Sequence, residues 1–187
     1  FYILHAGAGV PTGVYEILLF ILFMFVSLTG IIGYVVQMIL PRRMTETGEE
    51  IIYEKIPEEI YEIRSNARLA MLNYTKASGS DLLSKHYDSG LRWFFEQPRF
   101  YMNHVLGGAK APAWVRSQFD AIRRFASPDA MEHVDEIEKL AIHKLNVDTH
   151  FACQDVMKRW LLIHLPLAIA FLVTVLWHII LVHVYAS

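Results

Sequence analysis

The sequence contains a single cysteine, Cys153, among its 187 residues. One thiol cannot form an internal disulfide, so a small fold held together by disulfides is excluded. The metal-binding spacings HExxH and CxxC are also absent from the sequence. Acidic residues slightly outnumber Lys and Arg, which gives a formal net charge of −2. We therefore expect no nucleic-acid partner.

Charged residues are nearly absent from both ends of the chain. All 17 Lys and Arg lie between Arg42 and Arg159, and Glu16 is the one acidic residue outside that range. The 28 residues from Trp160 to Ser187 carry no Asp, Glu, Lys or Arg. A helix of that length is ~42 Å long, more than the ~30 Å hydrocarbon core of a bilayer. The sequence therefore predicts a transmembrane helix over residues 159–186.

A second uncharged stretch predicts another transmembrane helix over residues 14–40, which Thr12 caps and Pro41 ends. Residues 1–13 contain three glycines and a proline, which favours a segment at the membrane edge. Residues 41–158 show helical periodicity in several segments, with a loop expected over 104–114. We predict an all-α membrane protein with two transmembrane helices joined by a mostly helical domain, part of a larger helical bundle.

Basic residues flank both apolar segments on the side of the middle region: Arg42 and Arg43 after the first, Lys158 and Arg159 before the second. Neither outer end of the chain carries Lys or Arg. The positive-inside rule then places the middle region on the cytoplasmic side of the membrane. We expect a multi-pass integral membrane protein surrounded by the lipid bilayer.

Three histidines interrupt the C-terminal apolar segment: His164, His178 and His183. His164 and His178 are fourteen residues apart, so they come within ~40° of the same face of a helix and lie ~21 Å apart along it. Neutral imidazoles so placed can each supply an axial ligand to a haem. Hydrogen bonds to a neighbouring helix, a proton path or another metal are the alternatives. His183 lies off that face, and we expect it to bond a neighbour or face water.

The H-x13-H spacing resembles the haem-carrying helices of the cytochrome b of respiratory bc complexes. The segment with Trp160, His164, Leu165, Pro166 and His178 resembles the last helix of bacterial membrane cytochromes b, the NarI-like and ferric-reductase-like di-haem subunits. The resemblance implies haem b as the cofactor, two haems in all, and a bacterial inner (cytoplasmic) membrane. No CxxCH is present, so we expect no covalently attached c-type haem.

The block from His5 through GIIGYVVQMILPRR is similar to the penultimate helix of the same cytochromes. On this resemblance His5 is a candidate axial ligand for the haem of His178, with a surface histidine as the equal alternative. Gly30 and Gly33 would leave room for a porphyrin edge, or else would allow close packing of two helices.

The ligand set of such a protein is incomplete within this chain. Two bis-histidine haems need four axial ligands, and Met24 and Met38 are the remaining weak candidates in the first helix. We expect the missing ligands from another membrane subunit, a second copy or a segment outside this sequence. The predicted function is a b-type haem electron-transfer subunit of a membrane redox complex, which works with redox partner proteins. The alternative is a haem-free accessory subunit that anchors a helical docking domain; a two-helix sensor module is a third.

The middle region offers histidines and aromatic residues without a recognisable motif. We expect its histidines to be solvated or to pack between helices, and Trp93, Phe94 and Phe95 to form a small core or a partner surface. Arg123 and Arg124 are expected on a solvated face, with pairing to the acids of a partner as the alternative, and Cys153 is expected as an inert buried thiol.

Overall fold

The computed structural model describes residues 13–78, 84–85, 87–128 and 131–185. Within these residues every regular element is a helix, so the prediction of an all-α chain is confirmed. Two of the helices are long and apolar enough to cross a membrane. The chain divides into two compact units. We call residues 1–38 with 157–187 the helix pair, and Ile39–Val156 the charged domain.

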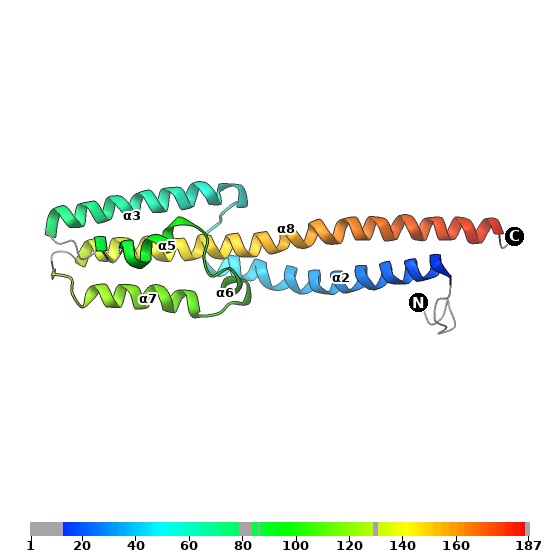
Figure 1. Ribbon diagram of the computed structural model, residues 1–187, viewed down its shortest axis with the longest axis horizontal. Helices are drawn as coiled ribbons and strands as arrows, with labels where there is room; N and C mark the ends of the chain where they lie inside the picture. Colours follow the sequence, from blue (N-terminus) through cyan, green and yellow to red (C-terminus); the bar gives the residue numbers. More distant parts are fainter. Residues whose placement is uncertain (1–12, 79–83, 86, 129–130, 186–187) are drawn as a thin grey trace. The chain divides into compact units, whose positions relative to one another are not determined.

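The helix pair is built from the first part of α2 (Val14–Glu46) and the last part of α8 (Met131–Tyr185), which run side by side (Figure 1). Half-buried positions recur every three or four residues along α8, so one stripe of it packs against α2. These positions include Trp160, His164, Leu167, Phe171, Thr174 and His178. The remaining apolar side chains point outward, with Leu162 74% exposed. A helix that is apolar on all sides is typical of a membrane span.

Helix α2 begins at Val14, as predicted, and Glu16 Oε2 accepts a hydrogen bond from the Gly13 N–H at 3.4 Å. Thr12, the predicted cap, lies outside the described residues. The predicted end at Pro41 is wrong, because the helix continues to Glu46. Proline removes one backbone hydrogen bond. Contacts beyond it compensate, since Arg43 donates hydrogen bonds to two backbone carbonyls of α6.

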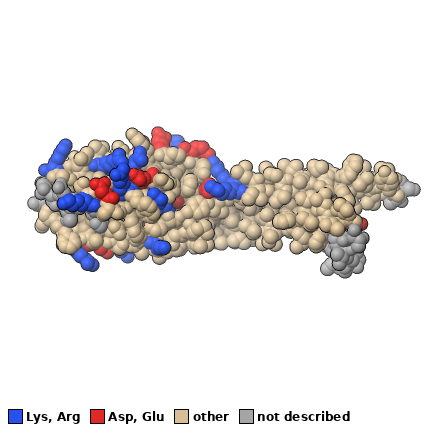
Figure 2. Space-filling model, in the orientation of Figure 1, with Lys and Arg blue, Asp and Glu red and all other residues tan. Residues whose placement is uncertain are grey.

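In the charged domain, helical elements of different lengths surround the first part of α8. In chain order they are η1 (Tyr53–Lys55), α3 (Ile56–Ser78), the π-helix η2 (Tyr87–Leu91), α5 (Arg92–Glu96), α6 (Tyr101–Leu106) and α7 (Lys110–Arg123). Helices α3 and α7 run along α8 (Figure 1). Figure 2 shows Lys, Arg, Asp and Glu over this domain, whereas the visible face of the helix pair is almost free of them.

The core of the charged domain joins α3, α5, α7 and α8. Its fully buried side chains include Ile63, Tyr74, Leu91, Phe94, Phe95, Phe119, Val134 and Ile137. Phe94 and Phe95 therefore belong to a core, which was one of the two roles predicted for the aromatic residues 93–95. Because these residues come from η2 as well as the four α-helices, the core ties together segments that are distant in the sequence.

Two helices depart from the predicted boundaries. The segment 104–114 is a loop only in its middle, because α6 extends through Leu106 and α7 begins at Lys110. Gly107 adopts φ +70° at the end of α6, a left-handed conformation that glycine reaches without strain. Gly107 and Gly108 thus mark the end of α6 inside the predicted loop. Helix α8 runs without interruption from the charged domain into the helix pair.

A buried ion pair lies within the charged domain on α8. Lys144 Nζ is 2.6 Å from Asp148 Oδ1 and 3.0 Å from the carbonyl oxygen of Gln97, and it lies 5.0 Å from the centre of the Phe94 ring. Asp148 Oδ2 accepts a hydrogen bond from the Arg99 N–H at 3.2 Å. Burial raises the pKa of Asp148 to about 6 and lowers the pKa of Lys144. Each charge is therefore stabilised chiefly by the other.

We predict that Lys144→Ala destabilises the charged domain by about 3–5 kcal/mol, because it leaves a buried carboxylate without its counter-charge. The matched control is Lys139→Ala, an exposed lysine on the same helix, which should stay within about 0.5 kcal/mol. Denaturant unfolding of the purified chain, followed by near-ultraviolet circular dichroism, measures both. Equal stability of the two variants would contradict a structural role for the ion pair.

Candidate functional site

His164 and His178 both lie on the side of α8 that packs against α2, in agreement with the face predicted from their spacing. His164 contacts Thr29 and His178 contacts Tyr15. Tyr15 and Thr29 are also fourteen residues apart, and they pair with the two histidines in reverse order because the two helices run antiparallel. The histidines therefore form two layers between the helices. His183 lies outside this stripe and is exposed.

The Thr29 hydroxyl forms a hydrogen bond with the His164 ring. Thr29 Oγ1 is 2.8 Å from His164 Nδ1 and also 2.8 Å from the carbonyl oxygen of Phe25, one turn earlier in α2. When the hydroxyl donates to this carbonyl oxygen, Thr29 Oγ1 accepts from the ring, and the imidazole proton lies on Nδ1. When the hydroxyl donates to Nδ1 instead, the imidazole proton lies on Nε2. Nε2 has no hydrogen-bond partner among the described residues, so the first arrangement leaves it a lone pair.

Trp160 holds the same imidazole in place from one turn earlier in α8. Its indole stacks on the His164 ring with 5.1 Å between centres and 16° between planes. The indole Nε1–H donates to the carbonyl oxygen of Thr29 at 2.8 Å. Thr29 is thus bonded to both α8 residues, through its side chain to His164 and through its backbone to Trp160. The orientation of the His164 ring is over-determined by these contacts.

The two glycines of α2 differ in what they contact. A Cβ at Gly33 would lie 2.0 Å from Cζ2 of Trp160, so only glycine admits the indole there. A Cβ at Gly30 would lie 3.7 Å from Cε1 of His164, an ordinary van der Waals contact. At Gly33 the glycine therefore allows close packing of the two helices, which was one of the two roles predicted for it. Gly30 borders the imidazole and leaves it a little more room.

The His178 layer has a different chemistry. Tyr15 stacks on the His178 ring with 5.9 Å between centres and 16° between planes. The Tyr15 hydroxyl donates to the carbonyl oxygen of Thr174 at 2.6 Å, which fixes the phenol against α8. His5, the predicted partner of His178 on a haem, lies outside the described residues. Its role as a ligand stays a prediction.

Comparison with known protein families, with curated proteins and with solved structures finds no match to this chain. The resemblance to membrane cytochromes b therefore rests on the residues quoted for it, and haem binding stays a prediction. Within the described residues no three His, Cys, Asp or Glu side chains gather into a metal site.

Several polar side chains of the charged domain serve its own packing. Cys153 is fully buried, and burial raises the pKa of its thiol, which agrees with the expected inert thiol. Arg123 forms ion pairs with Asp135 and Glu138 of α8, and its side chain remains 34% exposed, so on the predicted solvated face this residue is paired within the chain. The pairing was missed because the partners lie beyond the end of α7, outside any helical spacing from Arg123.

Sequence reasoning also missed Thr29 and Tyr15, the two α2 residues that contact the histidines. The sequence did contain a pattern that points to them. Tyr15 and Thr29 both carry a hydroxyl group, and the interval between them equals the fourteen residues between His164 and His178. For antiparallel helices an equal interval on both partners indicates layers in register. The sequence did not say which residue faces which, because that requires the offset between the helices.

We predict that Gly33→Ala destabilises the association of α2 with α8 by about 1–3 kcal/mol, because the added methyl group overpacks against the Trp160 indole. Gly30→Ala is the matched control one turn away and should be tolerated, since its methyl group meets His164 at an ordinary distance. Thermal unfolding of the two detergent-solubilised variants measures the difference. A Gly33→Ala variant as stable as Gly30→Ala would show that the indole does not occupy this position.

Proposed function

We propose that this protein is a b-type haem-binding electron-transfer subunit of a multi-subunit membrane redox complex. The observation that carries the proposal is the surroundings of His164, whose Nδ1 lies 2.8 Å from Thr29 Oγ1 while Nε2 has no hydrogen-bond partner among the described residues. His178 lies on the same side of α8, fourteen residues further along. The apolar outer faces of the helix pair support a location within the lipid bilayer.

The residues present fit an axial haem ligand. A histidine that binds a metal through one nitrogen usually donates its other N–H to a nearby acceptor, which sets the tautomer and the ring orientation. His164 meets this requirement through Thr29, and Trp160 restricts rotation of its ring. His164 and His178 would hold the iron of haem b, which supplies one-electron redox chemistry. An axial separation of ~21 Å puts one ligand toward each surface of a ~30 Å hydrocarbon core.

The partners follow from what the helix pair lacks. Each bis-histidine haem needs a second ligand, supplied by another membrane subunit, a second copy or a segment outside the described residues, for which His5 is the candidate at the His178 layer. Additional helices would pack on the exposed faces of α2 and α8 and close the haem sites. The charged domain would lie on the cytoplasmic side of a bacterial inner membrane, where it can meet redox partner proteins.

A haem-free accessory subunit is the second candidate function. The observation that favours it is the packing between the helices, where the Trp160 indole fills the space beside Gly33 and Tyr15 covers one face of the His178 ring. In that case both histidines serve as hydrogen-bonding and stacking groups in the helix pair. Iron and haem analysis of the purified complex separates the two candidates, since an anchor contains neither.

We predict that His164→Ala and His178→Ala each weaken the haem bands in the reduced-minus-oxidised visible spectrum of the purified complex. Each substitution removes one proposed axial ligand. His183→Ala is the matched control, because this histidine lies on the same helix outside the packed stripe, and its spectrum should be unchanged. Bands of full intensity in both the His164 and the His178 variant would exclude haem ligation by this helix.

We predict that Thr29→Val lowers the haem affinity of the His164 site about tenfold or more, the usual cost of removing a partner of a metal-ligating histidine. The midpoint potential of that haem should become more positive, because an imidazole that no longer donates from Nδ1 is a weaker electron donor to oxidised iron. Thr29→Ser retains the hydroxyl and should behave as the native chain. Haem quantification measures the affinity and redox titration measures the midpoint potential. If the Thr29→Val and Thr29→Ser variants have the same haem affinity and the same midpoint potential, this role of Thr29 is ruled out.

A further inference from the structure

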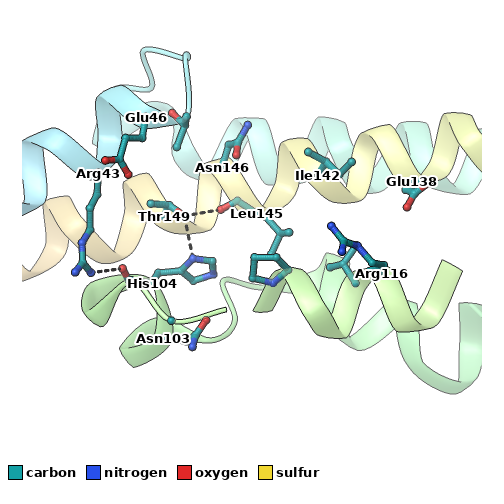
Figure 3. Close-up of a pocket in the computed structure, with 15 residues that line it drawn as sticks. Arg43, Glu46, Asn103, His104, Arg116, Glu138, Ile142, Leu145, Asn146 and Thr149 are labelled. Atoms are coloured by element: carbon teal, nitrogen blue, oxygen red, sulfur yellow. Dashed lines mark hydrogen bonds between the residues drawn. The ribbon is translucent and has the colours of Figure 1, made fainter. Parts of the chain in front are cut away.

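The charged domain holds an open cavity of about 440 Å³ that the proposed haem chemistry does not use. The end of α2, helix α6, helix α7 and the first part of α8 surround it (Figure 3). Its size falls within the range of small-molecule sites. The lining combines apolar side chains with charged and amide groups, which is the composition of a specific binding site. The apolar part consists of Pro112, Val115, Ile142 and Leu145.

His104 contributes a buried ring nitrogen to this cavity. Its Nδ1 is 2.9 Å from Thr149 Oγ1, which also lies 2.9 Å from the carbonyl oxygen of Leu145. Its Nε2 is buried and has no hydrogen-bond partner among the described residues. The residue is only 8% exposed. An unpaired buried polar nitrogen is costly, so a ligand that forms a hydrogen bond with it gains binding energy.

The ring of His104 stays neutral at physiological pH, because burial and the nearby Lys144 charge lower its pKa to about 4. Figure 3 shows the bonded nitrogen turned to Thr149 and the other nitrogen turned toward the side of the pocket where Leu145 and Arg116 lie. Nε2 is screened from solvent, so a donor reaches it by displacing side chains of the rim. Ile142 and Arg116 are exposed and free to shift.

Two guanidinium groups give the cavity a preference for anions. Arg43 is held by the carbonyl oxygens of His104 and Val105 and lies against Gly107, where a Cβ would come within 2.8 Å of Arg43 Cζ. Its charge is thus fixed at the wall by neutral groups and no described carboxylate forms an ion pair with it. Arg116 also makes no ion pair with a described residue. Such guanidinium groups suit the planar geometry of carboxylates.

The acidic side chains of the lining limit how much negative charge a ligand can carry. Glu138 is already paired with Arg123 of α7, whereas Glu46 brings a further negative charge to the rim. Two cations against one unpaired acid favour a ligand with one or two negative charges over a polyphosphate. The apolar wall accepts a short carbon skeleton.

We propose that this cavity binds a small hydroxylated carboxylate. A carboxylate of the ligand would pair with Arg116, the hydroxyl would form a hydrogen bond with His104 Nε2, and the carbon skeleton would rest on Val115, Ile142 and Leu145. The inference is independent of haem binding, because every residue that carries it belongs to the charged domain.

Isothermal titration of the full chain in lipid nanodiscs, with malate and succinate as the probes, tests the proposal. The two probes differ by one hydroxyl group, so malate should bind saturably and about tenfold or more tightly than succinate, the effect of one well-placed hydrogen bond. Arg116→Gln should weaken malate binding several-fold. Arg124→Gln, which alters an exposed arginine at the end of α7 outside the cavity, should leave it unchanged.

A second variant closes the cavity without touching its charged groups. Ile142→Trp places an indole at the rim, where Ile142 is 50% exposed, and should abolish malate binding while the melting temperature stays near that of the native chain. Saturable malate binding that Ile142→Trp or Arg116→Gln leaves intact would overturn the proposal. Equal affinity for malate and succinate, or no uptake of either at about 10 mM, well above usual small-ligand dissociation constants, would also overturn it.

Discussion

The helix pair depends on one short chain of hydrogen bonds, in which Thr29 Oγ1 bonds both His164 Nδ1 and the carbonyl oxygen of Phe25. An imidazole in an apolar medium is costly unless its polar atoms are paired. This chain pairs Nδ1 across the two helices. When His164 is the donor in it, Nε2 keeps the lone pair that the proposed haem binding requires.

The rest of the helix pair follows from the same layer. Trp160 stacks on His164 and bonds the Thr29 carbonyl, and its indole in turn requires glycine at position 33. Each step along α2 is matched by an equal step back along α8. Four residues separate Thr29 from Gly33 and Trp160 from His164, and fourteen separate the two layers on both helices. The antiparallel register is therefore set by a few contacts, and a change in one of them is felt in the others.

The same pairing of threonine with histidine recurs in the charged domain. Thr149 Oγ1 bonds both the carbonyl oxygen of Leu145 and the ring of His104, and Thr47, in the turn after α2, bonds both the carbonyl oxygen of Met44 and the ring of His150. A threonine in or just after a helix supplies this arrangement at little cost, because its hydroxyl reaches the carbonyl oxygen one turn earlier.

The sequence carried the parts of this picture that depend on local pattern. Uncharged ends predicted the two long apolar helices, and a fourteen-residue interval placed His164 and His178 on one face. Contacts between residues distant in the sequence were not predictable, such as those of Arg43 with the carbonyl oxygens of α6. The continuation of α2 through Pro41 was missed for the same reason, because these contacts lie beyond the proline. Thr29 was missed for the same reason, since its role appears only when the offset between α2 and α8 is known.

The most direct test of the central claim is the protonation state of the His164 imidazole in haem-free protein. Selective ¹⁵N-histidine labelling, with the His164→Gln variant to assign the signal, distinguishes a protonated nitrogen from one with a free lone pair. We predict a proton on Nδ1 and a lone pair on Nε2. A proton on Nε2 would contradict it, because Thr29 would then have to donate to the ring and no lone pair would remain for iron.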